Sequence, residues 1–486
     1  MTAENNKRRV IPYTPRVKNQ EPLTYEELRL GNRAKEVFRA NGGGRIGLDA
    51  ISGFPTYTNS RVAFGNLDTT DLVIAGILAG MNTCLIGSSG KGKSQVAEDI
   101  SNYYFGGKVS EGGNSAIITG SNDLQSIDDF FMRWNPLTQQ FEFNGNQNAV
   151  FHDIEEFNRC IDYVQNQLYS VLNGRFIGKS GSQTYLGKDG FLSLIATAND
   201  PRHTDGQGTF PTGEALWNRF GVILNPTNPL YKPTEADNNF IDEDLQGSGV
   251  LRAKPRDLTD KIVKASKQIS STATISQMGV EAQTMYNLIR QGLANCPTKG
   301  QKSNGVWYEN CAECPSTSSL CGKLRNPTNP RMLRNIVQYA QALDFLSKLK
   351  DSSVQIPQHE LILRAFELNS AYQPGVLNPN VLASADYSND NHKMMRDVVN
   401  QLRSEFESER GQRLCAVIEN ARAGNDTKFY KFNGKEKTYA CDPKQISEQK
   451  EFLEEIDPKF DNKGPVGYGW IPDYSNDRRE LNSGDN

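Results

Sequence analysis

The sequence predicts an α/β fold, a doubly wound parallel sheet, followed by an all-helical domain. From about residue 70, helix-like segments alternate with short apolar segments, which are NTCLIG, SAIITG, AVFHDI and FLSLIATAN. Helices between short apolar strands are typical of a parallel sheet covered on both faces. From about residue 255 helical spacing replaces this alternation, in LTDKIVKASKQIS, VEAQTMYNLIRQGLA, RMLRNIVQYAQALDFLSKL and HELILRAFELNSAY.

Length and composition set the class of protein. A chain of 486 residues exceeds what one hydrophobic core usually serves, so two or three domains are expected. A net charge of -3 with 23% charged residues excludes a polycation for nucleic acid and an acidic tail protein. No window approaches the run of about 18 apolar residues that a membrane span needs, and residues 1–20 lack the apolar middle of a secretion signal. We expect no membrane partner.

The cysteines indicate a reducing compartment, because four of the eight are scattered singly, at Cys84, Cys160, Cys415 and Cys441. An intracellular, cytoplasmic location is therefore expected. The predicted domains are an N-terminal arm with a leading helix (1–54), an α/β core (55–235), a helical domain (255–375) and a polar helical extension with a disordered end (376–486). A long helix is predicted over 392–421 in the extension.

The segment GSSGKGKS has the form G-x-x-x-x-G-K-[ST] and lies between a predicted strand and a predicted helix. In that setting backbone N–H groups turn inward around a phosphate at a helix N-terminus. Lys93 would contact the β and γ phosphates of ATP, and Ser94 would ligate Mg²⁺. The alternative is a glycine-rich turn without a ligand. The predicted ATP-binding residues are Gly87, Ser88, Ser89, Gly90, Lys91, Gly92, Lys93 and Ser94.

Several segments after this loop, in this order, resemble motifs of the MoxR-type and dynein-related branch of the AAA+ ATPases. They are SNDL, FNG, EEFNRC, LYSVLNGRFI, SQTYLGKDGFLSLIATAND, GQGTFPTGEALWNRFGVIL and NPRMLRNIVQYA. The resemblance covers roughly residues 55–370. It implies a P-loop NTPase core with a five-stranded parallel sheet, a helical lid, ATP between them and subunits in a ring, usually of six.

The resemblance also assigns three residues around the nucleotide. Asn199, after the apolar strand FLSLIATA, would contact the attacking water or the γ-phosphate as the first sensor. Arg219 in WNRF would act as an arginine finger on the neighbouring subunit's nucleotide, since a guanidinium matches the spreading phosphoryl charge. Arg331, at the start of the lid helix, would be the second sensor. Seen alone, Asn199 fits a turn cap and Arg219 a surface ion pair.

The acids in AVFHDIEEFNRC allow two registers. In the first, Asp153 binds Mg²⁺ and Glu155 activates water; this register keeps Asp153 out of the strand interior, where an unpaired carboxylate is costly. In the second, Glu155 binds Mg²⁺ and Glu156 is the base. We favour the second, because it places Asn158 and Arg159 where the family has an Asn-Arg pair. His152 is expected to pack or to form hydrogen bonds.

A cysteine cluster with the spacing C-x14-C-x2-C-x6-C lies within the helical region, at Cys296, Cys311, Cys314 and Cys321. Four thiolates give Zn²⁺ a closed tetrahedral site, so we predict structural zinc in an insertion into the lid. An iron–sulfur cluster and unliganded or disulfide-forming cysteines are the alternatives.

The predicted function is a ring ATPase that remodels or activates a client protein, with a von Willebrand A domain protein as a partner, as MoxR relatives have. One alternative is a nucleic-acid motor, supported by the zinc-like cluster and the basic arm. Another is a nucleotide-dependent scaffold with slow hydrolysis, because Glu replaces the usual Asp in the acidic motif.

Overall fold

The fold comes from a computed structural model, which describes part of the chain. The described residues are 62–88, 90, 92–121, 123–178, 183–199, 210, 212–226, 228, 256–291, 295–296, 300–301, 320–324, 330–408, 411–412, 415–416, 418–419, 427–432 and 435–440. The predicted arm and leading helix, Ser89, Lys91, Cys311 and Cys314 lie outside them. Only the backbone of Cys296 and Cys321 is described, so the predicted zinc site lies outside the described side chains.

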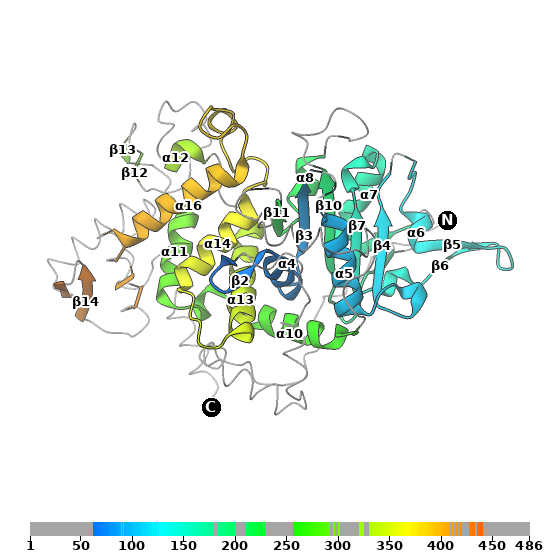
Figure 1. The fold of residues 1–486 in the computed structure, drawn as a ribbon, viewed down its shortest axis with the longest axis horizontal. Helices are drawn as coiled ribbons and strands as arrows, with labels where there is room; N and C mark the ends of the chain where they lie inside the picture. Colours follow the sequence, from blue (N-terminus) through cyan, green and yellow to red (C-terminus); the bar gives the residue numbers. More distant parts are fainter. Residues whose placement is uncertain are drawn as a thin grey trace, which may run out of the picture.

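A parallel sheet of five strands forms the first half of the molecule, as the sequence predicts (Figure 1). Its strands, in spatial order, are β11 (Val222–Leu224), β3 (Asn82–Gly87), β10 (Ser193–Asn199), β7 (Phe151–Glu155) and β4 (Ser115–Thr119). Nearly every side chain in these strands is buried, which explains their continuous apolar runs. Because all the strands run in one direction, their carboxyl ends share one edge, where Asn199 lies opposite Gly87 and Thr119 opposite Glu155.

Helices cover both faces of the sheet. They are α4 (Thr69–Leu78), α5 (Lys93–Phe105), α6 (Asp128–Phe131), α7 (Asp162–Leu172) and α8 (Glu214–Trp217), with 3-10 turns η2 (Val109–Glu111), η3 (Asn146–Asn148) and η4 (Phe157–Arg159). Leu85 and Ile195 pack with α4 and α5 in one hydrophobic cluster. Ile86 and Ile154 pack with α7 and α8 in the other. The alternation along the strands therefore separates two apolar layers.

The C-terminal helices include two that pack against α4. They are α10 (Thr259–Thr272), η5 (Ile275–Gln277), α11 (Val280–Gln291), α12 (Leu320–Lys323), α13 (Pro330–Lys350), α14 (Gln358–Ser370), α15 (Pro379–Leu382) and α16 (Asn391–Glu407). The Tyr339 hydroxyl of α13 donates to the Leu72 carbonyl of α4 at 2.7 Å. Apolar side chains of both helices belong to one cluster, so the sheet and these helices share a core.

Five antiparallel hairpins complete the described structure. They are β1 (Val62–Phe64) with β2 (Leu67–Asp68), β5 (Met132–Asn135) with β6 (Gln140–Phe143), β8 (Arg175–Ile177) with β9 (Gln183–Tyr185), β12 (Asn295–Cys296) with β13 (Gly300–Gln301), and β14 (Thr427–Phe432) with β15 (Lys435–Ala440). The β5–β6 hairpin projects from the body of the molecule at the far side of β4 (Figure 1).

The long helix predicted over 392–421 is interrupted. α16 ends at Glu407, and Ser408 has an extended backbone with φ -65° and ψ 163°. The Ser408 hydroxyl donates to the Glu405 carbonyl at 2.6 Å and accepts from the Gly411 N–H at 3.2 Å. A serine that bonds to its neighbouring backbone in this way competes with the helix, so the prediction was too long. In the described ranges, no helix has the length and apolarity needed to cross a membrane.

Candidate active site

The phosphate loop joins the end of β3 to the start of α5. Gly90 has φ +71° and Gly92 has φ +72°, which a residue with a side chain adopts at a cost. Among the described residues, a Cβ atom at either glycine would meet no atom within 4 Å. The first turn of α5 carries no acidic side chain, so its partial positive charge is available to an anion.

Lys93 is the first residue of α5 and has a buried side chain. Its ammonium group donates to the backbone carbonyls of Gly87 at 2.9 Å and Ser88 at 2.8 Å. The Lys93 ammonium group therefore lies against the phosphate loop, where it could also contact the oxygens of a bound phosphate. Ser94, the next residue, is partly exposed in the same turn.

Asp153 lies inside β7 and is fully buried. Its neighbours in register are Ile195 on β10 and Ile117 on β4. Neither carboxyl oxygen has a hydrogen-bond partner within the described structure. Burial, and then the charges of Glu155 and Glu98, raise the pKa of Asp153 well above its usual value, which favours its protonated form. Asp153 thus lies within the strand predicted from AVFHDI, and the argument for the first register, that Asp153 stays out of the strand interior, does not hold.

Glu155 is the last residue of β7 and is partly exposed at the carboxyl edge. The Thr119 hydroxyl, at the end of β4, donates to its Oε2 atom at 3.1 Å. Glu155 also affects Glu98 of α5: burial, and then the charge of Glu155, raise the pKa of Glu98. Glu155 is thus a carboxylate at a strand end, beside the helix that follows the phosphate loop.

Glu156 leaves the strand in the left-handed region, with φ +48°. A glutamate adopts this conformation only when its surroundings hold it there. Its N–H donates to the Thr197 hydroxyl of β10 at 2.9 Å, and its carboxylate lies 3.0 Å from Nε of Arg159. A Cβ atom at Gly120 would lie 2.6 Å from the Glu156 carbonyl oxygen, so this turn needs a glycine beside it.

Asn199 ends β10 and lies opposite Gly87, the first residue of the phosphate loop. Its backbone is held by Asn158, whose side-chain amide donates to the Asn199 carbonyl at 2.9 Å and accepts from the Asn199 N–H at 3.2 Å. Sequence reasoning used Asn158 only to choose the register of the acids. It missed Thr119 and Thr197, although a polar residue near the end of an apolar strand was a visible signal.

The two predicted arginines lie close together. The Arg219 guanidinium lies 4.8 Å from the centroid of the Tyr169 ring and donates to the Ala215 carbonyl. Arg331 donates to the Asn218 carbonyl at 3.2 Å. Burial, and then the charge of Arg331, lower the pKa of Arg219. The start of α13 therefore meets the segment that carries Arg219.

The described side chains include no group of three or more His, Cys, Asp or Glu that could hold a metal ion. A magnesium ion bound together with phosphates usually takes one or two carboxylates and keeps oxygens of the substrate and of water. Ser94 and Glu155 fit that need, since both are partly exposed near the carboxyl edge. His152 is buried beside Phe130 and Phe131, and burial lowers its pKa to about 4, so it packs as a neutral ring.

The sequence of this region matches a known family. Residues 82–220 match the profile of the AAA domain of the dynein-related subfamily. These residues form an AAA domain. The match runs from the first residue of β3 past Arg219, and therefore contains the phosphate loop, the three acids and Asn199. An AAA domain implies ATP and Mg²⁺ as the ligands of this edge and ATP hydrolysis as its reaction.

Solved structures agree on the fold. The crystal structure of a protein from Cytophaga hutchinsonii ATCC 33406, provisionally named an ATPase, superposes with a TM-score of 0.51 at 16% sequence identity. The match covers 78% of this chain and 96% of that one, so it includes helices outside the AAA domain. At this identity the match shows the fold alone. No curated protein matches the chain in sequence.

Proposed function

We propose that the protein is a ring-forming ATPase that couples ATP hydrolysis to remodelling or activating another protein. One observation carries the ATPase: the carboxyl ends of the adjacent strands β3, β10 and β7 share one edge, where the phosphate loop follows β3, Asn199 ends β10 and Glu155 ends β7. A nucleotide at that edge would meet a cation, a carboxylate and an amide together.

Binding would rearrange Lys93. Phosphate oxygens at the start of α5 would draw its ammonium group from the carbonyls of Gly87 and Ser88. Ser94 and Glu155 would hold Mg²⁺, which neutralises charge on the phosphates. A neutral Asp153 beneath them avoids a further negative charge where phosphates bind, which supports Glu155 rather than Asp153 as the ligand.

Glu156 would take the proton of the attacking water. Its turn holds it beside the end of β10, and breaking its contact with Arg159 would free the carboxylate. Asn199 would orient the water or the γ-phosphate. Arg219 would act on a neighbouring subunit's nucleotide, and Arg331 would report nucleotide state through α13. Hydrolysis would then depend on a ring, proposed as six subunits.

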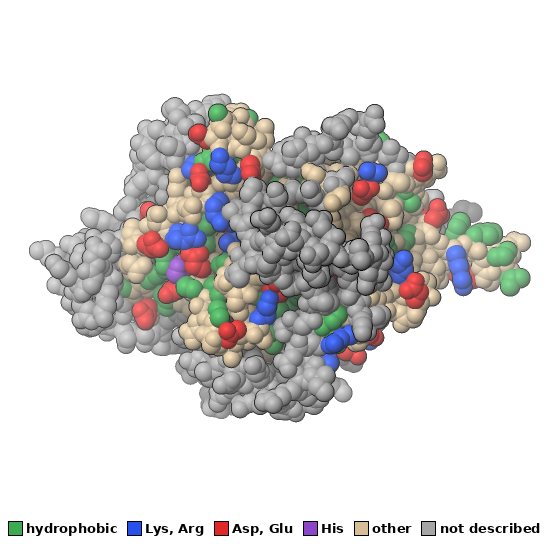
Figure 2. Space-filling model, viewed as in Figure 1, with side chains coloured by type: hydrophobic (Ala, Val, Ile, Leu, Met, Phe, Trp, Pro, Cys, Tyr) green, Lys and Arg blue, Asp and Glu red, His purple; other side chains and the backbone are tan. Residues whose placement is uncertain are grey.

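The client-directed role is supported by two hairpins. Six large hydrophobic side chains are exposed within the described residues, and five of them lie on β5–β6 and β8–β9: Trp134, Leu137, Phe141, Ile177 and Tyr185. Figure 2 shows hydrophobic side chains gathered on the projecting β5–β6 hairpin. Clustered exposed apolar side chains mark protein-binding surfaces. We propose that these hairpins contact the client, with a von Willebrand A domain protein as one partner class.

The ATPase is tested by steady-state hydrolysis with Lys93→Ala. Loss of the ammonium group should lower hydrolysis at least about 100-fold, because it contacts the transferred phosphates. Lys323→Ala is the matched control, since Lys323 is also a buried lysine but pairs with Asp397 at 3.7 Å among the C-terminal helices. Undiminished hydrolysis by Lys93→Ala would overturn the proposal. Mass photometry with ATP should show six times the chain mass of 54.1 kDa.

The client surface is tested with a permanently unfolded protein, reduced and carboxymethylated α-lactalbumin, as the probe. It should stimulate wild-type hydrolysis, and Trp134→Ser with Phe141→Ser should lose that stimulation. Tyr163→Ser is the control, because Tyr163 is similarly exposed but lies on α7. Equal stimulation of all three proteins would contradict the role of the hairpin.

A slowly hydrolysing scaffold is the second candidate. The observation that favours it is the contact between Glu156 and Arg159, which engages the proposed base. This alternative would be supported if the wild-type protein binds ATP and substitution of Glu156 does not lower its rate of hydrolysis further.

A further inference from the structure

Among the described strands, the last part of β10 has a partner on one side only. On one side, β10 pairs with β3 up to Asn199 opposite Gly87. On the other side, pairing with β7 ends with Ala196 opposite Ile154. The cause is the turn at Glu156, whose left-handed backbone directs the chain away from the sheet. The final residues of β10 therefore lack a backbone ladder on the side of the acids.

Two side chains bridge this gap. The Thr197 hydroxyl accepts a hydrogen bond from the Glu156 N–H at 2.9 Å. The Asn158 carboxamide makes two bonds to one residue, donating to the Asn199 carbonyl at 2.9 Å and accepting from the Asn199 N–H at 3.2 Å. These contacts continue the connection between the two chain segments beyond the last ladder pair.

A carboxamide is well suited to this position. It carries one acceptor and a donor in a plane, so it can pair with both the N–H and the C=O of a peptide unit, as a strand would. Asn158 and Asn199 are both buried, being 4% and 7% exposed, and water cannot easily replace these bonds. Aspartate would keep only the acceptor and would bring a charge against the Asn199 carbonyl.

Asn158 also connects to the segment that leads to Arg219. Its own backbone carbonyl accepts from the Phe210 N–H at 2.7 Å. Because Asn158 lies in the 3-10 turn directly after Glu156, one residue joins the turn of the proposed base, the end of β10 and the start of the next segment.

We propose that Asn158 is a positioning residue for ATP hydrolysis. Its carboxamide fixes the backbone of Asn199 against the turn that carries Glu156, and so sets the direction of the Asn199 side chain. This inference rests on the proposed ATPase function. It predicts that Asn158 affects the rate of the chemical step through Asn199 and leaves ATP binding by the phosphate loop intact.

The first test compares Asn158→Ala with Asn378→Ala. Asn378 is a matched control because it is 2% exposed, donates to the Gly322 carbonyl at 2.9 Å and accepts from the Asn380 N–H at 3.1 Å, far along the chain from the acids. Asn158→Ala should lower kcat at least about tenfold with the Kd for a fluorescent ATP analogue changed less than about threefold. Asn378→Ala should keep kcat within about twofold of wild type. Equal kcat for the two variants would overturn the inference.

The second test asks whether Asn158 acts through Asn199. In an Asn199→Ala background, adding Asn158→Ala should lower kcat by no more than about twofold, because the side chain that it positions is already gone. If the loss of kcat in the double variant equals the product of the losses in the two single variants, the inference is overturned. If Asn158→Ala does not fold, Asn158→Asp replaces it in both tests and should show a loss of kcat at unchanged Kd.

Lys93→Ala in the same assay separates the two proposals. Hydrolysis that persists in Lys93→Ala would remove the proposed function. In the other outcome, Lys93→Ala is inactive, but Asn158→Ala hydrolyses ATP as fast as Asn378→Ala does. That result would support the proposed ATPase and overturn only the positioning role of Asn158.

Discussion

Asp153 in the sheet and Glu367 between the helices are both buried carboxyl groups, but their surroundings differ. Asp153 has no hydrogen-bond partner within the described structure, and its pKa is raised well above its usual value, first by burial. Glu367, on α14, lies 2.9 Å from Nη1 of Arg364 and 2.9 Å from Nη2 of Arg396. Burial alone would raise the pKa of Glu367, but the two guanidinium charges outweigh it and the pKa is lowered.

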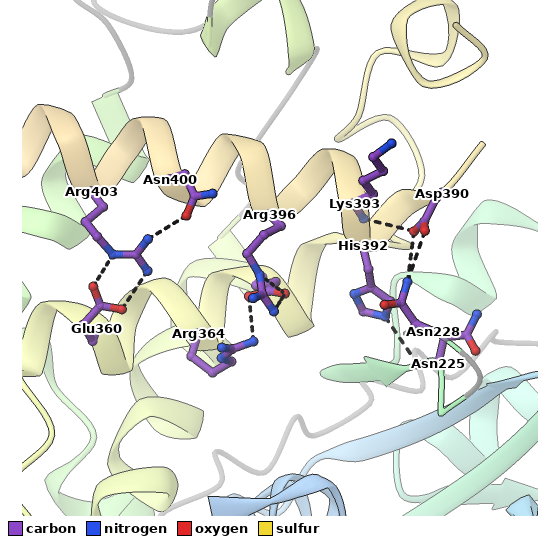
Figure 3. A network of polar contacts seen from close by, with 11 residues as sticks. Asn225, Asn228, Glu360, Arg364, Asp390, His392, Lys393, Arg396, Asn400 and Arg403 are labelled. Carbon is purple, nitrogen blue, oxygen red and sulfur yellow. Dashed lines mark hydrogen bonds and ion pairs between the residues drawn. The ribbon is translucent and has the colours of Figure 1, made fainter. Parts of the chain in front are cut away.

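The helical region thus pairs its buried charges. Figure 3 shows α16 joined to α14 by the contacts of Arg396 and, further along, by Arg403 with Glu360. The same helix reaches the end of β11, where His392 accepts from the Asn225 N–H at 3.4 Å. Charge here fixes the packing of helices. The sheet instead buries Asp153, whose pKa is raised, and leaves Glu155 and Glu156 partly exposed at its carboxyl edge.

The largest expected difference is in stability. Glu367→Ala leaves two partly buried guanidinium groups, those of Arg364 and Arg396, without their buried carboxylate, so the free energy of unfolding should fall by about 3 kcal/mol. Urea unfolding followed by circular dichroism measures it. Glu360→Ala is the control, because the Glu360–Arg403 pair is more exposed and should cost about 1 kcal/mol or less. Similar losses in both variants would show that burial does not set the cost.

The second-largest expected effect is a loss of folding stability as the pH falls. Burial lowers the pKa of His392 to about 4, helped by Arg396 and Arg364 and opposed by Glu367 and Asp390. The unfolded state therefore binds the proton first as pH falls, and stability should drop between about pH 6.5 and pH 4. Glu367, with its lowered pKa, adds to this loss at lower pH.

His392→Gln should make the curve of stability against pH flatter across that window, by an amount on the order of 1 to 3 kcal/mol. Urea unfolding at a series of pH values measures the change. His359→Gln is the control, since His359 is a histidine on α14 whose Nδ1 lies 2.9 Å from an exposed Glu281. A curve for His392→Gln that follows wild type would contradict a neutral His392.

The smallest stability effect is expected for Asp153→Asn. The amide has the shape of the neutral acid, so the free energy of unfolding should change by less than about 1 kcal/mol. Since wild type releases a proton on unfolding above about pH 4, the variant should become relatively more stable as pH rises. A loss as large as that of Glu367→Ala would show that Asp153 is a charged, paired group.

Much of the fold was predictable because the buried strands are short apolar runs between helices. NTCLIG and FLSLIATAN correspond to β3 and β10, and the spacing in RMLRNIVQYAQALDFLSKL gave α13. The β5–β6 hairpin was not predicted as a hairpin, since MRWN and QFEF are mostly exposed and lack a buried alternation. A strand that projects from the body buries few side chains, so its sequence lacks the pattern of apolar residues by which buried strands are predicted.

At the site, the loop motif predicts roles for Lys93 and Ser94, because backbone turns around phosphate need glycines at fixed positions. The hydrogen bonds of Asn158 and Thr197 depend on where two strands that are far apart in the sequence end, and this cannot be predicted from the local sequence. The strand AVFHDI was predicted with Asp153 inside it, but the raised pKa of Asp153 depends on its buried surroundings and on the nearby Glu155 and Glu98. The roles of the acids, Arg219 and Arg331 stay predictions.

The measurement that tests the central claim most directly is retention of radiolabelled ATP after gel filtration, with single-turnover hydrolysis, for three variants. Glu156→Gln should retain ATP and hydrolyse it at least about 100-fold more slowly, because the general base is lost. Glu155→Gln should weaken Mg²⁺-dependent binding, and Asp153→Asn should hydrolyse ATP within about threefold of wild type. An inactive Asp153→Asn beside a Glu156→Gln that hydrolyses ATP normally would contradict the account.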